Sequence, residues 1–293
     1  MPKNSSDSDP WDLRAAGQSH LTLAAVENLM AEDKLSLDDV MLKLLDLAAR
    51  YSSPQISGYS AAAVARGGSG RLYLGANAEY PGLTLATTVH AEQAATLNAW
   101  EHGESHLTSL AVTAPPCGHC RQFLYEIANA SDLRILLPNT VPQTLGVLLP
   151  CAFGPEELRS ARYLMDDLPT DILLSFDRPD ALSARTLDAA RRSYAPYSGA
   201  VAAAGLLLVD GSQVFGRYAE NAAFNPTIQP MSAALTMLRL ATGRPSDIVR
   251  AVLVSRRTRV GHIPSAIALL GSVSHVTLEA HEVTNGATGD RSQ

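Results

Sequence analysis

One order of apolar and helical segments occurs twice along this chain, and this repetition constrains the fold more than any other feature. The first pass opens with two short apolar runs around Gly67-Gly68-Ser69-Gly70, a sequence that favours a β-hairpin. Its predicted elements, in the order β-β-α-β-α-β, cover residues 61–66, 71–75, 89–100, 107–113, 119–129 and 133–138. Those of the second pass cover residues 200–209, 214–218, 231–240, 248–255, 264–270 and 276–280. An internal duplication of one α/β unit explains both passes.

The repeated order predicts a three-layer α/β fold with a duplicated core. Strands that alternate with helices form a largely parallel or mixed sheet, with helices on both of its faces. A small helical N-terminal module precedes the core, because Ser36 and Asp39 are spaced as a capping box. The helix that follows places six apolar residues on one face, namely Leu37, Val40, Met41, Leu44, Leu45 and Ala48. The first ten residues include three Ser, two Asp and two Pro, and we expect them to be disordered.

The charge and apolar pattern of the chain exclude several classes of partner. The 23 Lys and Arg residues are outnumbered by 29 Asp and Glu, a net charge of −6, so we expect no nucleic-acid polymer as a partner. No apolar run approaches the ~20 residues that span a bilayer, so we expect no membrane partner either. The first residues lack the basic-then-apolar order of a signal peptide, and we expect a cytoplasmic protein. In a reducing compartment, three cysteines indicate a metal site or catalysis rather than disulfides.

Two predicted helix starts carry the residues that suggest chemistry. His90-Ala91-Glu92 opens the first helix after the hairpin, and Pro116-Cys117-Gly118-His119-Cys120 opens the next. A C-x-x-C sequence at a loop-to-helix junction can place both sulfurs on one metal ion, and His90 supplies a third ligand. The fourth position of a tetrahedral zinc ion then stays open for water, which is typical of a catalytic site. The partial positive charge of a helix N-terminus stabilises thiolates at these positions.

Glu92 follows His90 by two residues, which places it beside the metal rather than on it. Two thiolates and a neutral imidazole cancel the charge of Zn²⁺, so the ion keeps less power to acidify water and a nearby base is useful. Glu92 can accept the proton of that water and pass it to a leaving group. Taken alone, the C-x-x-C sequence also fits a redox pair or half of a structural zinc site. A structural site has no use for Glu92, and His119 is a poor fourth ligand because it lies between the two cysteines.

These motifs resemble those of the cytidine deaminase family, in its longer form with two core domains and a homodimeric assembly. The pattern H-x-E followed by P-C-x-x-C is the signature of zinc deaminases. The resemblance runs from about Ser36 to Ala280 and includes GANAEY at 75–80, TVHAEQ at 88–93, PCGHCRQF at 116–123 and AFGP at 152–155. It implies that His90, Cys117 and Cys120 hold one zinc ion per chain and that Glu92 shuttles the proton. The spacing of these four residues suggests the same roles.

The resemblance also implies a set of substrate-binding residues. Asn77-Ala78-Glu79 matches the family's N-x-E segment, which binds the ribose hydroxyls, and an amide with a carboxylate supplies the donor and acceptors that a sugar hydroxyl needs. Tyr59 corresponds to an aromatic residue that stacks on the pyrimidine. The longer form usually has Phe preceded by Asn at this point, whereas this chain reads Ser57-Gly58-Tyr59-Ser60, and a tyrosine hydroxyl needs a partner. Phe153 matches a residue that reaches the neighbouring subunit's pocket, although it equally fits a core position.

The second pass lacks the residues that a metal site needs. Residues 218–224 resemble the substrate strand, and residues 227–231 resemble residues 88–92 at a shift of 139. Gln229 then replaces His90, Met231 replaces Glu92, and no C-x-x-C follows. We therefore expect a catalytically inactive copy that serves structure and dimer contacts. The expected segments are a tail and helical module at 1–48, a catalytic zinc domain at 49–150, a crossing segment at 151–182 and the degenerate domain at 183–293.

The leading functional prediction is zinc-dependent hydrolytic deamination of cytidine and 2′-deoxycytidine to the uridines and ammonia, as in pyrimidine salvage. The expected partners are a nucleoside substrate and a second copy of the chain. Three alternatives stay open. Because the region around Tyr59 departs from the family pattern, the zinc core also fits a deaminase of another cytosine-like nucleoside or heterocycle. A deaminase of nucleotides or of bases in RNA or DNA is disfavoured by the net charge, and a non-catalytic, zinc-stabilised homologue has no use for Glu92.

Overall fold

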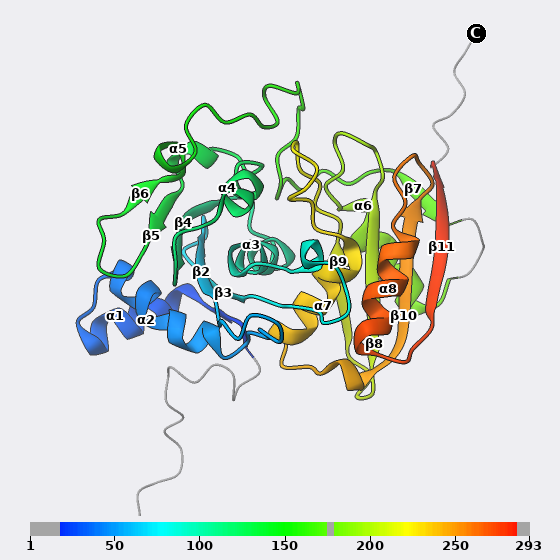
Figure 1. Cartoon of the computed structure of the whole chain (residues 1–293), viewed down its shortest axis with the longest axis horizontal. Coiled ribbons are helices and arrows are strands. Elements are labelled where there is room, and N and C mark those ends of the chain that lie inside the picture. The colour runs from blue at the N-terminus through cyan, green and yellow to red at the C-terminus, as the bar shows by residue number, and fades with distance from the viewer. Residues whose placement is uncertain (1–17, 175–178, 286–293) are drawn as a thin grey trace, which may run out of the picture. The chain divides into compact units, whose positions relative to one another are not determined.

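A computed structural model describes residues 18–174 and 179–285 of the chain, which divide into two units (Figure 1). Unit 1 comprises residues 1–79, 88–152 and 239–243, and unit 2 comprises residues 80–87, 153–238 and 244–293. The first ten residues, which are predicted to be disordered, lie outside the described ranges. No helix within those ranges is long and apolar enough to cross a membrane. The four segments expected from the sequence stay a prediction.

Unit 1 is built on a mixed sheet with the strand order β1-β3-β2-β4-β5-β6. β4 and β5 run parallel, and the other neighbours run antiparallel. The strands are β1 (His20–Leu21), β2 (Ala62–Gly67), β3 (Leu72–Ala76), β4 (Leu107–Val112), β5 (Arg134–Leu136) and β6 (Gln143–Thr144). β2 and β3 form the predicted hairpin, in which Ala62 pairs with Ala76 and Arg66 with Leu72. The apolar pattern does not indicate β1 and β6, which have two residues each.

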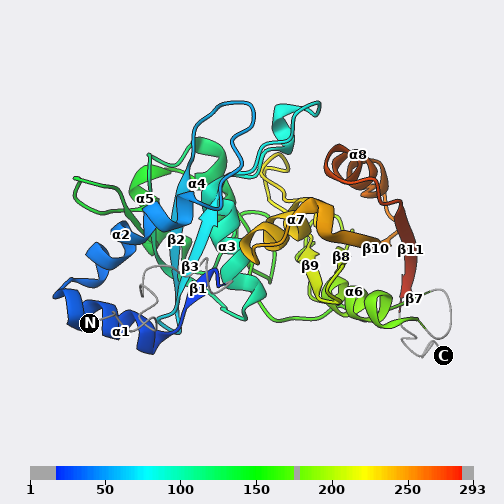
Figure 2. The same cartoon turned by 90° about the horizontal axis from the view of Figure 1, so that it is seen from below.

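Helices cover both faces of this sheet. They are α1 (Leu23–Asp33), α2 (Leu37–Ala49), α3 (Ala91–Glu101), α4 (Gly118–Leu124) and α5 (Leu145–Leu148), with a 3₁₀ turn η2 (Ala130–Asp132). α2 and α3 pack on opposite faces of β2 and β3 (Figures 1 and 2). α2 begins with the predicted capping box, in which the side chains of Ser36 and Asp39 each accept a hydrogen bond from the other's backbone N–H. Its predicted apolar face is buried except for Leu37, which is half-buried.

Unit 2 repeats the order of elements on a mixed sheet with the strand order β7-β11-β10-β8-β9. β10 and β11 run parallel, and the other neighbours run antiparallel. The strands are β7 (Ile172–Leu174), β8 (Ala202–Leu208), β9 (Gln213–Arg217), β10 (Ile248–Arg256) and β11 (Leu278–Asn285). The helices are α6 (Ala181–Arg191), α7 (Pro230–Leu240) and α8 (Ile263–Val273), with 3₁₀ turns η1 (Leu85–Thr87) and η3 (Pro245–Asp247). The predicted β-β-α-β-α-β order is thus present in both units.

Two isolated β-bridges give the register of the duplication. Ala78 pairs with Val89 in unit 1, and Ala219 pairs with Ile228 in unit 2. The residue numbers of Val89 and Ile228, which precede the helices, therefore differ by 139, as the sequence predicts. Those of Ala78 and Ala219, which follow the hairpins, differ by 141. The connection between strand and helix is two residues shorter in unit 2.

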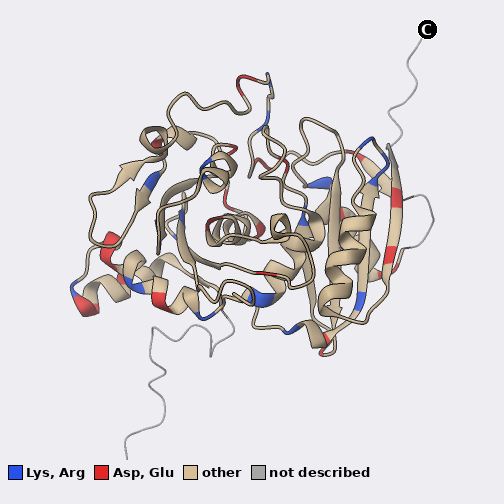
Figure 3. Ribbon diagram, in the orientation of Figure 1, with Lys and Arg blue, Asp and Glu red and all other residues tan. Residues whose placement is uncertain are grey.

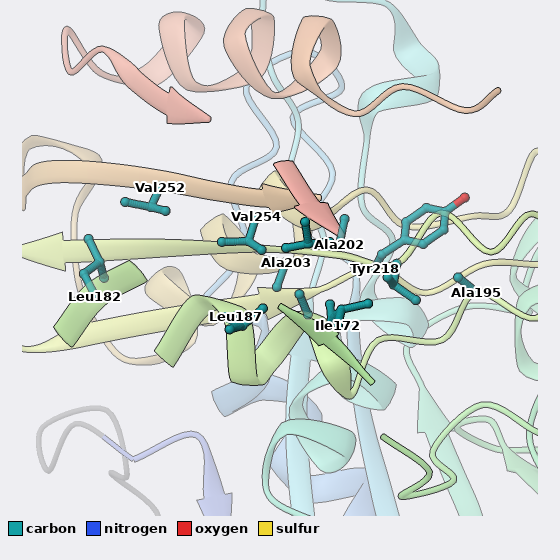
Figure 4. Packing of buried hydrophobic residues seen from close by; sticks show 12 residues of the cluster. Ile172, Leu182, Leu187, Ala195, Ala202, Ala203, Tyr218, Val252 and Val254 are labelled. Carbon is teal, nitrogen blue, oxygen red and sulfur yellow. The ribbon is translucent and has the colours of Figure 1, made fainter. Parts of the chain in front are cut away.

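The core of unit 2 lies between α6 and the sheet (Figure 4). Leu182 and Leu187 of α6 face a group of small and branched side chains on β8 and β10. The buried cluster comprises Ile172, Leu182, Leu187, Ala190, Ala195, Val201, Ala202, Ala203, Tyr218, Val252, Val254 and Val283. Tyr218 belongs to this cluster and directly follows β9, at the end of the β8–β9 hairpin. This part of unit 2 corresponds to the predicted active site of unit 1.

A glycine permits the close approach of the hairpin to the helix that carries His90. A Cβ atom on Gly75 of β3 would lie 2.2 Å from the backbone nitrogen of Ala95 and 2.4 Å from the carbonyl oxygen of Ala91. Gly216 of β9 stands in the same relation to α7, because its Cβ atom would lie 2.0 Å from the backbone nitrogen of Ala234. Backbone atoms cannot yield as a flexible side chain can, so the position of each helix depends on a glycine at this point.

We predict that Gly75→Ala lowers the free energy of unfolding by about 1–3 kcal/mol, because the added methyl group forces α3 away from β3. Urea denaturation followed by circular dichroism measures this loss. Gly271→Ala in α8 is the matched control, because no described atom outside the adjacent backbone of the same helix and its two chain neighbours lies within 4 Å of its Cβ position, and alanine favours helix. Equal urea midpoints for Gly75→Ala and the unmodified chain would contradict the proposed close contact.

Candidate metal centre and active site

His90 is held at the start of α3 by contacts of the backbone around it. It is the N-cap residue of this helix, and its backbone N–H donates to the side-chain oxygen of Gln93 at 3.0 Å. Gln93 itself is fully buried. The preceding residue, Val89, exchanges two backbone hydrogen bonds with Ala78, at 2.9 and 3.0 Å. The imidazole is therefore fixed at a helix N-terminus beside the end of the hairpin.

Cys117 and Cys120 lie at the start of α4. Cys117 is its N-cap residue, and the backbone N–H of Cys120 donates to the Cys117 sulfur at 3.4 Å. Arg121 fixes the turn before them, since its Nε donates to the Pro116 carbonyl oxygen at 2.8 Å and its Nη1 to that of Leu148 at 2.6 Å. The roles of Arg121 and Gln93 are not predictable from the sequence, because nothing in a motif shows which backbone groups a side chain will bind.

The three predicted metal ligands meet at one point. His90 Nδ1 lies 3.2 Å from the Cys120 sulfur and 3.6 Å from the Cys117 sulfur, and the two sulfurs are 3.6 Å apart. Ligands of one tetrahedral zinc ion, at about 2.3 Å for sulfur and 2.1 Å for nitrogen, lie roughly 3.5–3.8 Å from one another. Within residues 18–174 and 179–285, this is the one group of histidine, cysteine and acidic side chains arranged to hold a metal ion. Donor chemistry and spacing both fit zinc.

The protonation of the cluster favours a cation at its centre. Hydrogen bonds from Cys120 and His90 lower the pKa of the Cys117 thiol to about 3, so this group is a thiolate at neutral pH. The hydrogen bond to Cys117, together with burial, raises the pKa of Cys120. Without a cation the cluster thus carries one thiolate, and a divalent ion is needed to stabilise the second.

Glu92 lies in the first turn of α3 and is 7% exposed. Burial raises the pKa of its carboxyl group above the ordinary value. Among the described residues, the metal-binding group does not include Glu92, yet Glu92 lines the same pocket as His90 and Cys117. A buried carboxyl group with a raised pKa, next to a metal site, is suited to proton transfer near neutral pH.

Two of the three predicted metal ligands, His90 and Cys117, line a pocket of about 270 Å³. The residues that line it are Ser57, Tyr59, Ala61, Ala62, Asn77, Glu79, Thr88, His90, Ala91, Glu92, Val112, Thr113, Ala114, Pro115 and Cys117. The pocket thus brings Tyr59, Asn77 and Glu79, which come from the hairpin region, together with the metal cluster. This space is large enough for a small organic molecule.

Asn77 and Glu79 hold the turn that carries Tyr59. Asn77 accepts the Ala61 N–H at 3.0 Å and donates to the Tyr59 carbonyl oxygen at 2.9 Å. One carboxylate oxygen of Glu79 accepts the N–H groups of Ile56 and Ser57 at 2.7 and 2.8 Å, and the other accepts the Ser57 hydroxyl at 2.5 Å. Burial opposes ionisation of Glu79, but these hydrogen bonds outweigh it and lower the pKa of Glu79. Sequence reasoning missed Ser57, whose hydroxyl orients the Glu79 carboxylate.

The remaining predicted substrate residues differ in their placement. Tyr59 is 55% exposed at the pocket. Ala78 is buried, and its backbone groups bind Val89 rather than face the pocket. Phe153 lies in unit 2 and is 44% exposed. The contacts of these residues with a substrate stay predictions.

Comparison with known proteins identifies the family. Two models of the cytidine and deoxycytidylate deaminase zinc-binding region match this chain, one over residues 35–133 and the other over residues 145–266. The chain is 42% identical to a cytidine deaminase of Pectobacterium atrosepticum over 262 residues, which cover 89% of this chain and 88% of that protein. This chain belongs to the cytidine deaminase family. A cytidine deaminase of Shewanella baltica is 41% identical over 261 residues, with the same coverage of 89% and 88%.

One solved member of the cytidine deaminase family is shorter. The crystal structure of cytidine deaminase from Mycobacterium tuberculosis is 32% identical in sequence and has a TM-score of 0.37. The match covers 40% of this chain and 96% of that one. Zinc is the cofactor that the family models and the His90, Cys117 and Cys120 cluster support.

We predict that His90→Ala or Cys120→Ser reduces the zinc content of the purified chain from about one ion to less than ~0.1 per chain, because two ligands do not hold zinc as three do. Inductively coupled plasma mass spectrometry measures the metal. Cys151→Ser is the matched control, since Cys151 is the third free cysteine and lies outside the cluster. Retention of a full zinc ion by Cys120→Ser would contradict the assigned ligand set.

Proposed function

We propose that this chain catalyses the zinc-dependent hydrolytic deamination of cytidine and 2′-deoxycytidine to uridine and 2′-deoxyuridine, with release of ammonia. The observation that carries the proposal is the buried Glu92 carboxyl group in the same pocket as a three-donor zinc cluster. The names of the relatives from Pectobacterium atrosepticum and Shewanella baltica support cytidine as the substrate. Pyrimidine salvage is the corresponding role.

His90, Cys117 and Cys120 would hold the zinc ion, which when bound supplies a Lewis acid that lowers the pKa of water. In the reaction, the oxygen of a water molecule bonds to C4 of the base, and the bond between C4 and the exocyclic nitrogen then breaks. Glu92 accepts the proton that the water loses and delivers it to N3. The hydroxyl group now on C4 then gives its proton, through Glu92, to the exocyclic amine, so that C4 keeps the oxygen as a carbonyl and the amine leaves as ammonia.

The other pocket residues bind and orient the nucleoside. Asn77 and Glu79 supply an amide and a carboxylate for the ribose hydroxyls, and Tyr59 provides an aromatic face for the pyrimidine. Because Ala78 fixes the backbone between them through Val89, it sets their spacing. Phe153 from a second copy of the chain completes the pocket in a homodimer. A cytoplasmic location suits the three free cysteines, two of which must stay reduced to bind zinc.

The charge of the site favours a nucleoside over a nucleotide. Among the described residues that line the pocket, none is Lys or Arg, the side chains that recognise phosphate. Lys and Arg residues are scattered along the described chain, and no helix carries a run of them (Figure 3). The acidic side chains Glu79 and Glu92 would repel a phosphate at this position.

We predict that Glu92→Gln lowers kcat for cytidine by about 10²–10⁴-fold, because the amide cannot accept and return a proton. The fall in the cytidine absorbance band measures turnover, and the zinc content of the same sample serves as the control. Near-normal turnover by zinc-loaded Glu92→Gln would refute the role of Glu92. Competition between cytidine and its monophosphate, on the unmodified chain, tests the preference for a nucleoside.

We further predict that Ser57→Ala raises the KM for cytidine by about 3–10-fold, since it removes one hydrogen bond to a charged group that positions Glu79. Steady-state kinetics measures the change, and zinc content should stay at that of the unmodified chain. Ser198→Ala is the matched control, because Ser198 and Glu220 make the equivalent backbone contact in unit 2, at 3.1 Å. An unchanged KM in Ser57→Ala would show that the Ser57 hydroxyl has no part in positioning Glu79.

A further inference from the structure

The three metal ligands of unit 1 have counterparts at the starts of the corresponding helices of unit 2, and these residues differ in chemistry. Gln229 follows the bridge of Ala219 with Ile228 as His90 follows the bridge of Ala78 with Val89. Its carbonyl oxygen accepts the Ala233 N–H at 3.0 Å, as the His90 carbonyl oxygen accepts that of Ala94 at 3.0 Å. Gln229 therefore holds the place of His90 at the start of the helix.

His262 and Ser265 hold the places of the two cysteines. α8 follows β10 as α4 follows β4, and His262 is the N-cap residue of α8 as Cys117 is of α4. Ser265 comes three residues later, as Cys120 does, and its hydroxyl donates to the His262 carbonyl oxygen at 2.9 Å. Sequence comparison alone misses this correspondence, because the segment His262-Ile263-Pro264-Ser265 shares no residue with the C-x-x-C motif.

His262 links three parts of unit 2. Its Nδ1 lies 3.0 Å from the side-chain amide of Gln229, and its Nε2 lies 2.8 Å from the carbonyl oxygen of Ala200. The ring packs edge-on against Tyr218 with a centroid distance of 4.6 Å and is 2% exposed. Burial lowers the pKa of His262, which favours the neutral ring with a single N–H. Both ring nitrogens face oxygen atoms, Oε1 of Gln229 and the carbonyl oxygen of Ala200, and Nε2 donates to Ala200. Turning the Gln229 amide by 180° places its NH₂ group at Nδ1, which then accepts from it.

We propose that His262 replaces the metal ion as the internal link of unit 2, and that residues 229, 262 and 265 are a latent zinc site. In unit 1, zinc would join the N-termini of α3 and α4. In unit 2, the hydrogen bond between Gln229 and His262 joins the N-termini of α7 and α8, and the bond to Ala200 adds the turn before β8. It follows that unit 2 folds without metal, whereas the stability of unit 1 depends on zinc.

The direct test restores the donor set. The full chain carrying Gln229→His, His262→Cys and Ser265→Cys should bind about two zinc ions, against about one for the unmodified chain, as counted by plasma mass spectrometry. Loading with cobalt(II) should double the thiolate-to-cobalt absorbance per chain, a readout independent of turnover. The same three substitutions combined with Cys117→Ser should bring the zinc content back to about one. A folded triple variant that still binds one zinc ion overturns the latent site.

A second test does not depend on how the triple variant folds. His262→Ala should lower the melting temperature by ~5 °C with the zinc content unchanged, whereas His275→Ala, an exposed histidine of the same unit, should not lower it. Gln229→Ala should lower the melting temperature less when His262→Ala is already present than when it is introduced into the unmodified chain, because the two side chains act as a pair. A His262→Ala melting temperature within about 1 °C of the unmodified value overturns the link. Cytidine turnover and zinc content are measured on the same samples, including the unmodified chain. A failure of the proposed function would show as absent turnover in the unmodified chain, whereas a failure of the link would show in the melting temperatures alone.

Discussion

Two helix N-termini, those of α3 and α4, bring one imidazole and two sulfur atoms within 3.6 Å of one another. Without a cation, the cluster holds one thiolate, Cys117, and one thiol, Cys120, whose pKa is raised by its hydrogen bond to Cys117 and by burial. A zinc ion allows both sulfurs to be thiolates, because it attracts them and is stabilised by them. Contacts in the surrounding fold hold these groups in place. Gly75 allows α3 to pack closely against the hairpin. Gln93 accepts the backbone N–H of His90, and Arg121 donates to the carbonyl oxygen of the residue before Cys117.

The two units show which features belong to the fold and which belong to the chemistry. Both keep a glycine under the central helix, and both keep a glutamate that accepts backbone N–H groups from the preceding turn, Glu79 in unit 1 and Glu220 in unit 2. Unit 2 lacks the zinc donors and the proton-transferring acid, and by the register of the two bridges Tyr218 takes the place of Asn77. The hydrogen bonds of Glu79 to the preceding turn are therefore part of the fold as well as of the proposed substrate site, and their loss is expected to affect both.

Sequence alone predicts the duplicated order of elements, because hairpin glycines and apolar runs are local signals. It also predicts His90, Glu92, Cys117 and Cys120, since metal ligands and a base need fixed residue types at fixed spacing. It does not predict the two-residue strands or helix α6. These elements are stabilised by strand pairing and helix packing with residues that are distant in the sequence. Nor does it predict the contacts of Arg121 and His262, because the partners are backbone carbonyl groups that carry no sequence signal.

The most direct test of the account is the absorbance change of cytidine with the purified chain, combined with a zinc count on the same sample before and after chelation. The account predicts about one zinc ion per chain, conversion of cytidine to uridine, loss of conversion when the zinc is removed, and recovery when zinc is returned. A chain that holds its zinc and leaves cytidine unchanged would contradict the proposed reaction.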